Sequence, residues 1–406
     1  MLTVMTACQA REALETTFGA YRTAKESVSL GDALGRVLAE PIIARENVPD
    51  FDRSMVDGYA VCASDTFGCS ENTPAMLKLI GKAEMGETQT HRIAPGESLY
   101  VPTGGALPAG GDAMVMLEYA ETCGDGFVYL EKPAAPGMHV IFRGDDLREG
   151  QCALERGKCL RPQDIGVLAA LGYETVPVYQ KPKVAILSTG TELLPVGGTP
   201  MGSQVRDVNG SAFAAAVKNT GGETAFCGIF RDDEEEIFSA ASKALTDCDM
   251  VLISGGSSVG EQDLTRRIVD RLAGSSLLFH GLAVKPGKPT IAATVGGKPV
   301  FGLPGHPVSA YMIFEIFVRP VLQSMMGCDG VRHAVTATLA QNLPSNHGRE
   351  EYVPVALNKR EGETIARPIA GKSGLISTLA QADGYLQIDR NCEGLEAGTA
   401  VSVTLF

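Results

Sequence analysis

The stretch Met250-Val251-Leu252-Ile253-Ser254-Gly255-Gly256-Ser257-Ser258-Val259-Gly260 decides the fold that we predict for this chain. An apolar run is followed at once by a glycine-rich turn, and residues 264–272 then show the apolar spacing of a helix. A buried strand that leads through a tight turn into a helix is the building unit of a parallel α/β sheet. Glycines in such a turn also let backbone N–H groups approach an anion closely.

The same alternation of strand and helix extends over residues 181–326. Apolar runs predict strands at 184–187, 250–254, 290–294 and 300–303, and helical spacing predicts helices at 211–219, 233–245, 264–272 and 308–325. We therefore expect a central three-layer α/β domain with a mostly parallel sheet.

The flanking segments have a different character. Residues 47–148 hold short β-like runs separated by glycine and proline clusters, which predicts an inserted β-rich domain. Residues 1–46 and 149–180 are expected to form a helical, elongated N-terminal domain, with helices at Val28–Ala39 and Pro162–Leu171. Residues 331–406 return to alternating patterns typical of a small β-barrel or sandwich.

Composition excludes several classes of function. The 406 residues carry a net charge of -13, which argues against a nucleic-acid-binding surface. The ten cysteines contain no C-x-x-C pair, so we expect no zinc site and reduced thiols. No run of 18 apolar residues and no signal-peptide pattern occurs, so we expect a cytoplasmic protein that does not enter a membrane. In so acidic a chain, an anionic ligand must be held by local positive features.

Four loops are predicted at the carboxyl ends of strands, where ligands bind in open parallel sheets. They are Ser188–Glu192, Ser254–Gly260, Lys285–Pro289 and Gly302–Pro307. Each has a purely structural alternative: the first is also a capping box of Thr189 with Glu192, and the others also fit ordinary turns or a solvated surface loop.

Positive features concentrate in the last two loops. Lys285 and Lys288 lie in a proline-stiffened segment and form the best local cation pair for a phosphate or an oxyanion. Pro307 fits the first turn of the helix that follows, and the N–H groups at the start of a helix favour an anion.

Two acidic residues lie beside these loops. Asp232 and Asp263 are each compatible with a helix N-cap, and Glu235 fits as the capping-box partner of Asp232. Carboxylates next to phosphate-binding loops are better explained by a divalent cation, Mg²⁺, between them and the ligand. Glu192 is placed to orient a water or the oxyanion.

Taken together, these segments resemble the molybdopterin molybdenumtransferase family, of the MoeA and gephyrin C-terminal-domain type. The resemblance covers essentially the whole chain. It is carried by the order and spacing of eight strings, at residues 51–60, 103–104, 143–146, 188–192, 231–233, 254–260, 285–289 and 302–307.

The resemblance implies an enzyme that inserts molybdenum from molybdate into adenylylated molybdopterin and releases AMP, assisted by Mg²⁺. It implies a homodimer whose active site is shared between subunits. A molybdopterin adenylyltransferase would act upstream, and molybdoenzymes or their chaperones would receive the cofactor. The residues implied as catalytic are Asp57, Glu192, Asp232, Asp263 and Lys285, with Asp232 and Asp263 holding the metal. Those implied in substrate binding are Thr103, Asp146, Ser254, Gly255, Gly256, Ser257, Gly260, Lys288, Pro304, Pro307, Arg349 and Ser373.

The sequence departs from the family pattern at several positions. His306 stands where relatives often have asparagine, Ile141 where many have arginine, and Gly281 where some have lysine. Gly-Asp-Asp at 144–146 replaces the usual Gly-Glu-Asp. Three alternatives remain open: a tungstate-specific enzyme, a non-catalytic paralogue that acts as a pterin-binding scaffold, and an adenylyltransferase, which residues 181–326 alone resemble.

Overall fold

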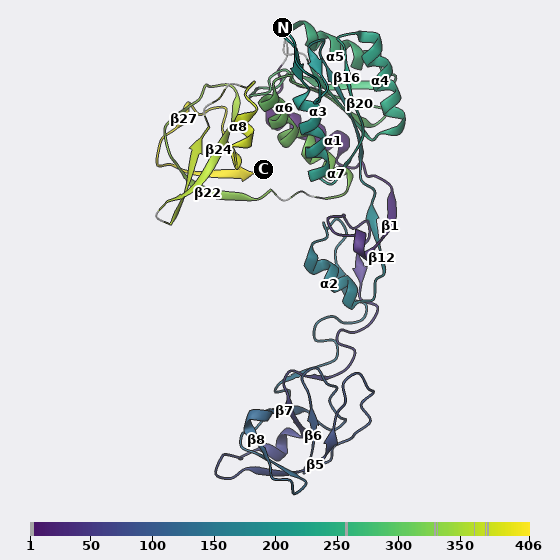
Figure 1. The fold of residues 1–406 in the computed structure, drawn as a ribbon, viewed down its shortest axis with the longest axis vertical. Helices are drawn as coiled ribbons and strands as arrows, with labels where there is room; N and C mark the ends of the chain where they lie inside the picture. The colour runs from purple at the N-terminus through teal and green to yellow at the C-terminus, as the bar shows by residue number, and fades with distance from the viewer. Residues whose placement is uncertain are drawn as a thin grey trace.

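The computed structural model describes residues 4–255, 259–328, 330, 332–360, 362–369, 371 and 373–406, and for residues 259–263 it describes the backbone alone. The molecule is elongated, with the central sheet and the C-terminal barrel at one end and the inserted β-rich domain at the other (Figure 1). The described part of the chain contains no helix long and apolar enough to cross a membrane.

The central sheet has six strands in the order β16-β13-β17-β21-β20-β18. Their bounds are β13 Lys183–Thr189, β16 Glu223–Phe230, β17 Met250–Gly255, β18 Ser275–His280, β20 Ile291–Val295 and β21 Lys298–Leu303. The first four in the spatial order are mutually parallel, whereas β20 and β18 pair antiparallel with their neighbours. The prediction of a mostly parallel sheet is confirmed.

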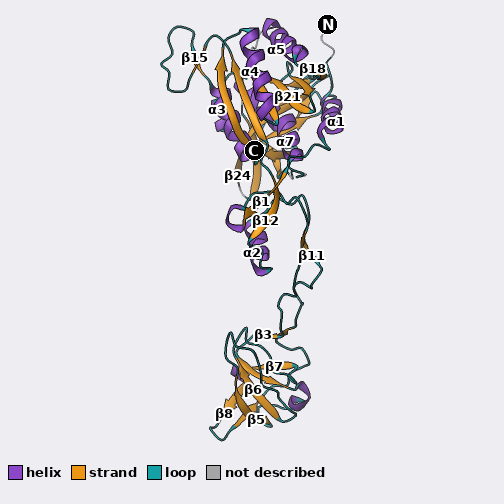
Figure 2. Ribbon diagram, turned by 90° about the vertical axis from the view of Figure 1, so that its right-hand side faces the viewer, coloured by secondary structure: helices purple, strands orange, loops and turns teal. Residues whose placement is uncertain are grey.

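Helices cover both faces of this sheet, as the prediction of three layers requires (Figure 2). Val184 and Ile186 of β13 are buried against α3 (Val208–Asn219) and the long C-terminal helical segment, while Ala185 and Leu187 are buried on the opposite face against α4 (Glu234–Asp247) and α5 (Val259–Arg271). The strand is apolar throughout because both of its faces are covered.

The predicted long apolar helix at 308–325 is present but is interrupted. It consists of α6 (Pro307–Ile313), a π-helical turn, η4 (Phe314–Val318), and α7 (Arg319–Met325). Pro307 occupies the first turn of α6, as predicted.

The register places all four predicted loops along one edge of the sheet. Ser188 pairs with Ser254, and Ser254 pairs with Leu303, so the first, second and fourth loops leave neighbouring strands at the same level. Gly302 pairs with Ile291, and Ile291 pairs with His280. The segment with the two lysines, which runs between His280 and Ile291, therefore begins and ends at this edge too.

The helix predicted at Val28–Ala39 is wrong. Residues Lys25–Ser29 form strand β1, which pairs antiparallel with β12 (Thr175–Tyr179), and a short 3-10 turn, η1 (Leu30–Asp32), follows. Every second residue of β1 is partly buried, as expected for a strand, whose side chains alternate between two faces. The side chain of Ser29 caps the turn that follows by accepting from Asp32 N–H at 3.3 Å. Gly35 at φ 73° then ends any helical continuation.

The N-terminal helix lies elsewhere. Helix α1 (Ala7–Phe18) begins at a capping box of Thr6 with Gln9, and its apolar face is buried in the core of the central α/β domain. Helix α2 (Pro162–Ala170), which was predicted, packs in the segment between the two ends of the molecule. The domain boundaries predicted at residues 46/47, 148/149, 180/181 and 326/331 stay predictions.

The inserted domain is built on a six-stranded sheet in the order β7-β4-β6-β5-β9-β8. Its strands are β4 Gly58–Val61, β5 Ala75–Lys82, β6 Glu97–Val101, β7 Ala113–Met116, β8 Ala120–Thr122 and β9 Phe127–Leu130, joined by the turns η2 (Ala63–Thr66) and η3 (Leu117–Tyr119). Two short ladders connect it to the rest of the chain: β3 (Arg53–Ser54) with β10 (Val140–Ile141), and β2 (Ile42–Ile43) with β11 (Cys152–Leu154).

The C-terminal strands close into the predicted barrel. Strands β24 (Glu350–Arg360), β25 (Glu363–Pro368), β22 (Ala334–Leu339), β28 (Ala400–Leu405) and β26 (Gly384–Ile388) follow one another, and β26 pairs back with β24. A small ladder of β23 (Leu343–Pro344) with β27 (Gly394–Leu395) and the short helix α8 (Ser377–Ala380) complete this unit.

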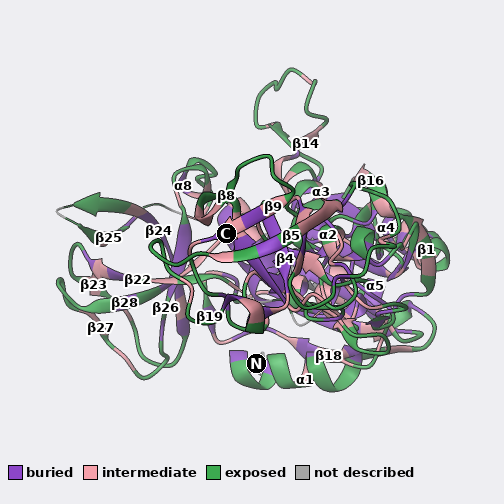
Figure 3. Cartoon of the chain, turned by 90° about the horizontal axis from the view of Figure 1, so that it is seen from below, coloured by how far each residue is buried: buried purple, intermediate pink, exposed green. Residues whose placement is uncertain are grey.

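Two further short elements belong to the region of the predicted site. Strand β19 (Val284–Lys285) adds to the barrel as a parallel neighbour of β24. Strands β14 (Leu193–Leu194) and β15 (Val205–Arg206) form the base of a loop that stands clear of the body and carries the exposed side chains of Val196 and Met201 (Figure 3).

Candidate functional site

A small cleft of about 350 Å³ lies at the carboxyl edge of the central sheet. The ends of β13 and β17, the start of α3 and the start of α6 form its walls. Four of the predicted site residues line it: Glu192, Ser254, Gly255 and Pro307. Ser188, Thr189, Gly305 and His306, which belong to two of the predicted loops, also line it. Residues that the sequence analysis did not single out complete the lining, namely Leu193, Val205, Arg206, Asp207, Val208, Asn209, Gly374 and Ile376.

Gly255 is required by a close approach of two strands. It pairs with Thr189, and a Cβ atom at this position would lie 1.8 Å from Thr189 Oγ1 and 2.4 Å from the Thr189 carbonyl oxygen. Every other residue type would therefore force β13 and β17 apart at the edge that bears the cleft. The role predicted for Gly255 in substrate binding is thus accompanied by a structural one.

Asn209 connects three walls of the small cleft. Its Nδ2 donates to Ser254 Oγ and to the Gly305 carbonyl oxygen, both at 2.9 Å, so the first turn of α3 holds the end of β17 and the loop before α6. Nothing in the local sequence reveals this, because both partners are far away along the chain. Asp207 caps the same helix by accepting from Gly210 N–H at 2.9 Å.

Ser188 adds an unsatisfied polar group to the small cleft. Its side chain is buried, and its Oγ has no hydrogen-bond partner among the described residues. A buried hydroxyl of this kind costs free energy unless a ligand or water pairs with it, so it fits a polar ligand group at the start of α3.

Asp232 binds the loop after β13 and does not cap a helix. Its Oδ2 accepts from both N–H and Oγ of Thr191 at 3.0 Å. The N-cap of α4 is the next residue, Asp233, which accepts from Glu236 N–H at 2.9 Å. The N-cap alternative for Asp232 is therefore wrong. The capping-box alternative for Thr189 and Glu192 is also wrong, because strand β14 follows directly.

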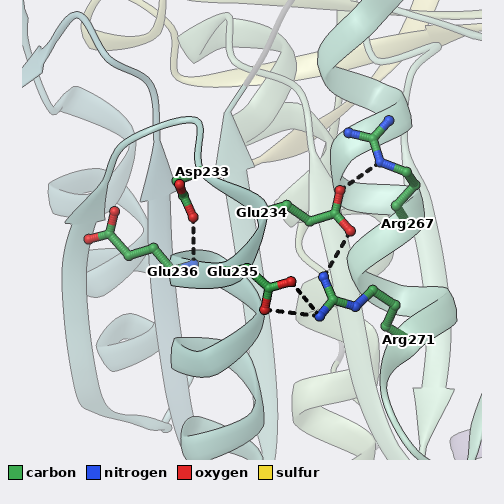
Figure 4. A network of polar contacts seen from close by, with 6 residues as sticks. All are labelled: Asp233, Glu234, Glu235, Glu236, Arg267 and Arg271. Carbon is green, nitrogen blue, oxygen red and sulfur yellow. Dashed lines mark hydrogen bonds and ion pairs between the residues drawn. The ribbon is translucent and has the colours of Figure 1, made fainter.

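The acidic start of α4 is clamped to α5 (Figure 4). Glu234 pairs with Arg267 at 2.8 Å and with Arg271 at 2.9 Å, and Arg271 also pairs with Glu235 at 2.8 Å. Hydrogen bonds from Arg267 and then Arg271 lower the pKa of Glu234 below its usual value. These contacts hold the start of α4 against α5.

A larger cleft of about 950 Å³ adjoins the first and lies between the central domain and the barrel. Lys285, Lys288, Arg349 and Ser373, all predicted as site residues, line it. His306 and Gly374 line both clefts.

The cation Lys285 already has an anionic partner. Its Nζ lies 2.7 Å from an oxygen of Glu351, to which the parallel pairing of β19 with β24 brings it. The sequence had not indicated Glu351. The positive charge that the sequence predicts for this loop is therefore partly neutralised in the structure.

Some predicted residues lie outside these two clefts or outside the described residues. Pro304 is buried in the turn after β21. Gly256 and Ser257 are not among the described residues. Gly260 lies in the first turn of α5, and Asp263 lies further inside α5, so the N-cap alternative for Asp263 is wrong; its side chain is not described.

The predicted residues of the inserted domain lie at the far end of the same chain. Asp57 Oδ1 accepts from Thr103 N–H at 2.9 Å, so these two residues are together. Asp146 lies between strands β10 and β11, where its N–H donates to the carbonyl oxygen of Val48 at 3.1 Å. The sheet that carries β4 and β6 is remote from the central sheet in both ribbon views (Figures 1 and 2), so one chain does not bring Asp57 and Thr103 to the clefts.

A preformed metal cage is absent from the described part of the chain, where no three His, Cys, Asp or Glu side chains gather. Mg²⁺ does not require one, because it is usually held by one or two carboxylates together with water and phosphate oxygens. The carboxylate of Asp232, beside the loop that carries Glu192, is an oxygen donor of the kind that suits this ion.

Fold and clefts together define a class: a multidomain α/β protein that binds a polar, anionic ligand along the carboxyl edge of its central sheet. Comparison with known proteins gives the family. Residues 5–172 match the model of the MoeA N-terminal region (domains I and II), residues 185–324 that of a probable molybdopterin binding domain, and residues 336–406 that of the MoeA C-terminal region (domain IV).

Full-length relatives agree with these matches. The chain is 33% identical to the molybdopterin molybdenumtransferase of Bacillus subtilis, over 94% of this chain and 90% of that protein. It is 34% identical to a putative molybdopterin biosynthesis protein of Methanocaldococcus jannaschii, over 94% and 92%. A molybdopterin biosynthesis MoeA protein from Pyrococcus horikoshii superposes with a TM-score of 0.87 at 34% identity, covering both chains completely. The chain belongs to the MoeA family.

Proposed function

We propose that this chain is a molybdopterin molybdenumtransferase, which inserts molybdenum from molybdate into adenylylated molybdopterin and releases AMP. The observation that carries this proposal is the pair of adjoining clefts along one sheet edge. One is lined by Ser188, Ser254 and the start of α3, and the other by two lysines and an arginine. The B. subtilis relative bears the name of this activity and aligns with nearly the whole chain.

The clefts suit the two substrates differently. Hydroxyl groups, a glycine backbone and a helix N-terminus in the small cleft fit phosphate oxygens. Lys285, Lys288, Arg349 and Ser373 fit the doubly charged oxyanion in the larger cleft. Cleaving a phosphoanhydride and bringing an oxyanion to two sulfurs both depend mainly on positioning and charge neutralisation.

Mg²⁺ belongs to this proposal as a helper of the phosphate group. Asp232 and Asp263 would hold it, and when bound it neutralises charge on the phosphate oxygens. Asp232 also fixes the loop of Thr191 and Glu192, so Asp232→Asn separates the two roles: the amide oxygen can still accept from Thr191, while the negative charge is lost. We expect Asp232→Asn and Asp263→Ala to bind the pterin and to fail in AMP release. Normal AMP release by either variant would remove that residue from the mechanism.

A second copy of the chain would complete the site. The sheet beside Asp57 and Thr103 is remote from the clefts of its own chain (Figure 1), so we propose a homodimer in which the inserted domain of one subunit, with Asp57, Thr103 and Asp146, faces the clefts of the other. Mixing two inactive variants, Asp57→Ala and Lys285→Ala, tests this. Random reassociation restores one intact site in each mixed dimer, or roughly one quarter of wild-type activity. Activity that stays at the level of the separate variants would refute a shared site.

The remaining assignments follow from the reaction. An adenylyltransferase would supply the adenylylated pterin, molybdoenzymes or their chaperones would take the product, and the cytoplasm would be the compartment. The decisive experiment supplies adenylylated molybdopterin, Mg²⁺ and either molybdate or tungstate, and measures AMP release and metal incorporation. We expect both with molybdate. Incorporation with tungstate alone would support the tungstate-specific alternative, and pterin binding without turnover would support the scaffold.

A further inference from the structure

We propose that His306 is a positioning residue, whose ring Nδ1 orients the hydroxyl of Ser373 toward the oxyanion in the larger cleft. The inference rests on the proposed function only in assigning the oxyanion to that cleft. His306 belongs to the central domain and Ser373 to the C-terminal segment, so the contact joins the two parts of the chain between which the cleft lies.

Two hydrogen bonds hold Ser373 at the start of α6. Val308 N–H donates to the Ser373 carbonyl oxygen at 3.0 Å, and His306 Nδ1 lies 2.9 Å from Ser373 Oγ. The first bond fixes the backbone of Ser373 but leaves its side chain free to rotate. The second bond selects the rotamer, so the imidazole decides where the hydroxyl points.

The direction of the second bond matters for an anion. When Nδ1 carries the ring proton it donates to Ser373 Oγ, and the hydroxyl proton is then available for an oxyanion. An oxyanion accepts hydrogen bonds and offers none, so this arrangement gives it a donor that an unoriented hydroxyl supplies less often. His306 lines the small cleft as well and thereby forms part of the wall between the two ligands.

Three substitutions of His306 distinguish the contribution of each ring nitrogen from that of the ring's size and shape. Asparagine places its amide near the position of Nδ1, glutamine reaches toward the position of Nε2, and phenylalanine keeps the ring without a nitrogen. We expect His306→Asn to bind molybdate or tungstate within about twofold of wild type, and His306→Gln and His306→Phe to bind it roughly 3- to 10-fold more weakly. Isothermal titration of the protein with each oxyanion alone measures this. His91→Phe, in the inserted domain, is the matched control and is expected to bind as wild type does.

A double-mutant cycle tests whether His306 acts through Ser373. In a Ser373→Ala background, His306→Phe should cause no further loss of oxyanion affinity. In turnover, the KM for the oxyanion should rise in His306→Phe while kcat stays within about twofold, and His306→Asn should restore the KM. Additive losses in the cycle, or His306→Asn binding as weakly as His306→Phe, would overturn the proposal. Failure of the wild-type protein to bind either oxyanion would overturn the proposed function as well, whereas equal binding by all variants would overturn only the role of His306.

Discussion

Replacing Gly255 by alanine tests whether the spacing of β13 and β17 sets the geometry of the small cleft. The new Cβ would lie 2.4 Å from the carbonyl oxygen of Thr189, and real Cβ contacts are essentially never shorter than 3.0 Å. Rotation of the Thr189 side chain can relieve the contact with Oγ1, but the backbone contact remains. The two strand ends must therefore part by at least 0.6 Å, from 2.4 to 3.0 Å. Overpacking of this kind costs roughly 1–3 kcal/mol of stability.

Gly255→Ala should impair catalysis as well as stability. A displacement of about 1 Å at a reacting centre costs on the order of 100-fold in rate, so we expect AMP release to fall roughly 10- to 100-fold. Thermal unfolding and AMP release are measured side by side. Gly166→Ala is the matched control, because Gly166 is an exposed helix residue and a Cβ there would meet nothing within 4 Å apart from its chain neighbours and the backbone of its own helix. It should gain roughly 0.5–1 kcal/mol and keep full activity. A Gly255→Ala variant that melts and turns over like wild type would refute the reasoning.

Two further predictions follow from ion pairs. Glu351→Gln removes the carboxylate that lies 2.7 Å from Lys285, so we expect oxyanion binding to tighten by roughly threefold to tenfold at low ionic strength and less at high salt; unchanged titration curves at both salt concentrations would contradict a role for Lys285. Asp164 is buried, which by itself raises the pKa of its carboxyl, but Lys158 and then Arg161 outweigh burial and lower the pKa below the unfolded value. Its stabilising effect is present above the unfolded pKa of about 4 and is lost as the pH falls through the folded pKa. Asp164→Asn should therefore cost roughly 1–3 kcal/mol in urea unfolding at pH 7, nearly as much at pH 4, and progressively less as the pH is lowered further through the folded pKa; a loss that does not shrink below pH 4 would contradict the ion-pair assignment.

The central fold was predictable because its signals are local and repeated. The apolar runs that became β13, β17 and β21 are short and buried on both faces, and the next helices along the chain are α3, α5 and α6. Parallel pairing then dictates that the loops after them meet at one edge. The segment Val28–Ala39 failed because its apolar spacing fits a helix equally well, and the competing strand β1 is stabilised by β12, which lies about 150 residues further on.

The candidate site was only partly predictable, for a related reason. Loops could be assigned from glycine, proline and lysine, but the contacts that organise them join residues far apart in the sequence. Asn209 bonds Gly305, and Lys285 pairs with Glu351 only because β19 joins the barrel. The cap of α4 was misplaced by one residue, since Asp232 and Asp233 are equivalent in sequence terms and only the bond from Thr191 distinguishes them.

Under the proposed function, this acidic chain binds an oxyanion in the larger cleft beside the barrel. With a net charge of -13, long-range electrostatics repels a dianion, so binding depends on cations gathered within a few ångströms. Lys285 and Lys288 come from the central domain, but Arg349 and Ser373 are supplied from the C-terminal side of the cleft, which also supplies the neutralising Glu351. The pairing of Lys285 with Glu351 in the β19–β24 ladder and the contact of His306 with Ser373 hold the two sides together. The larger cleft therefore exists only where the two domains meet. The central α/β domain alone supplies Lys285 and Lys288 but lacks Arg349 and Ser373, so it should bind the oxyanion far more weakly than the intact chain.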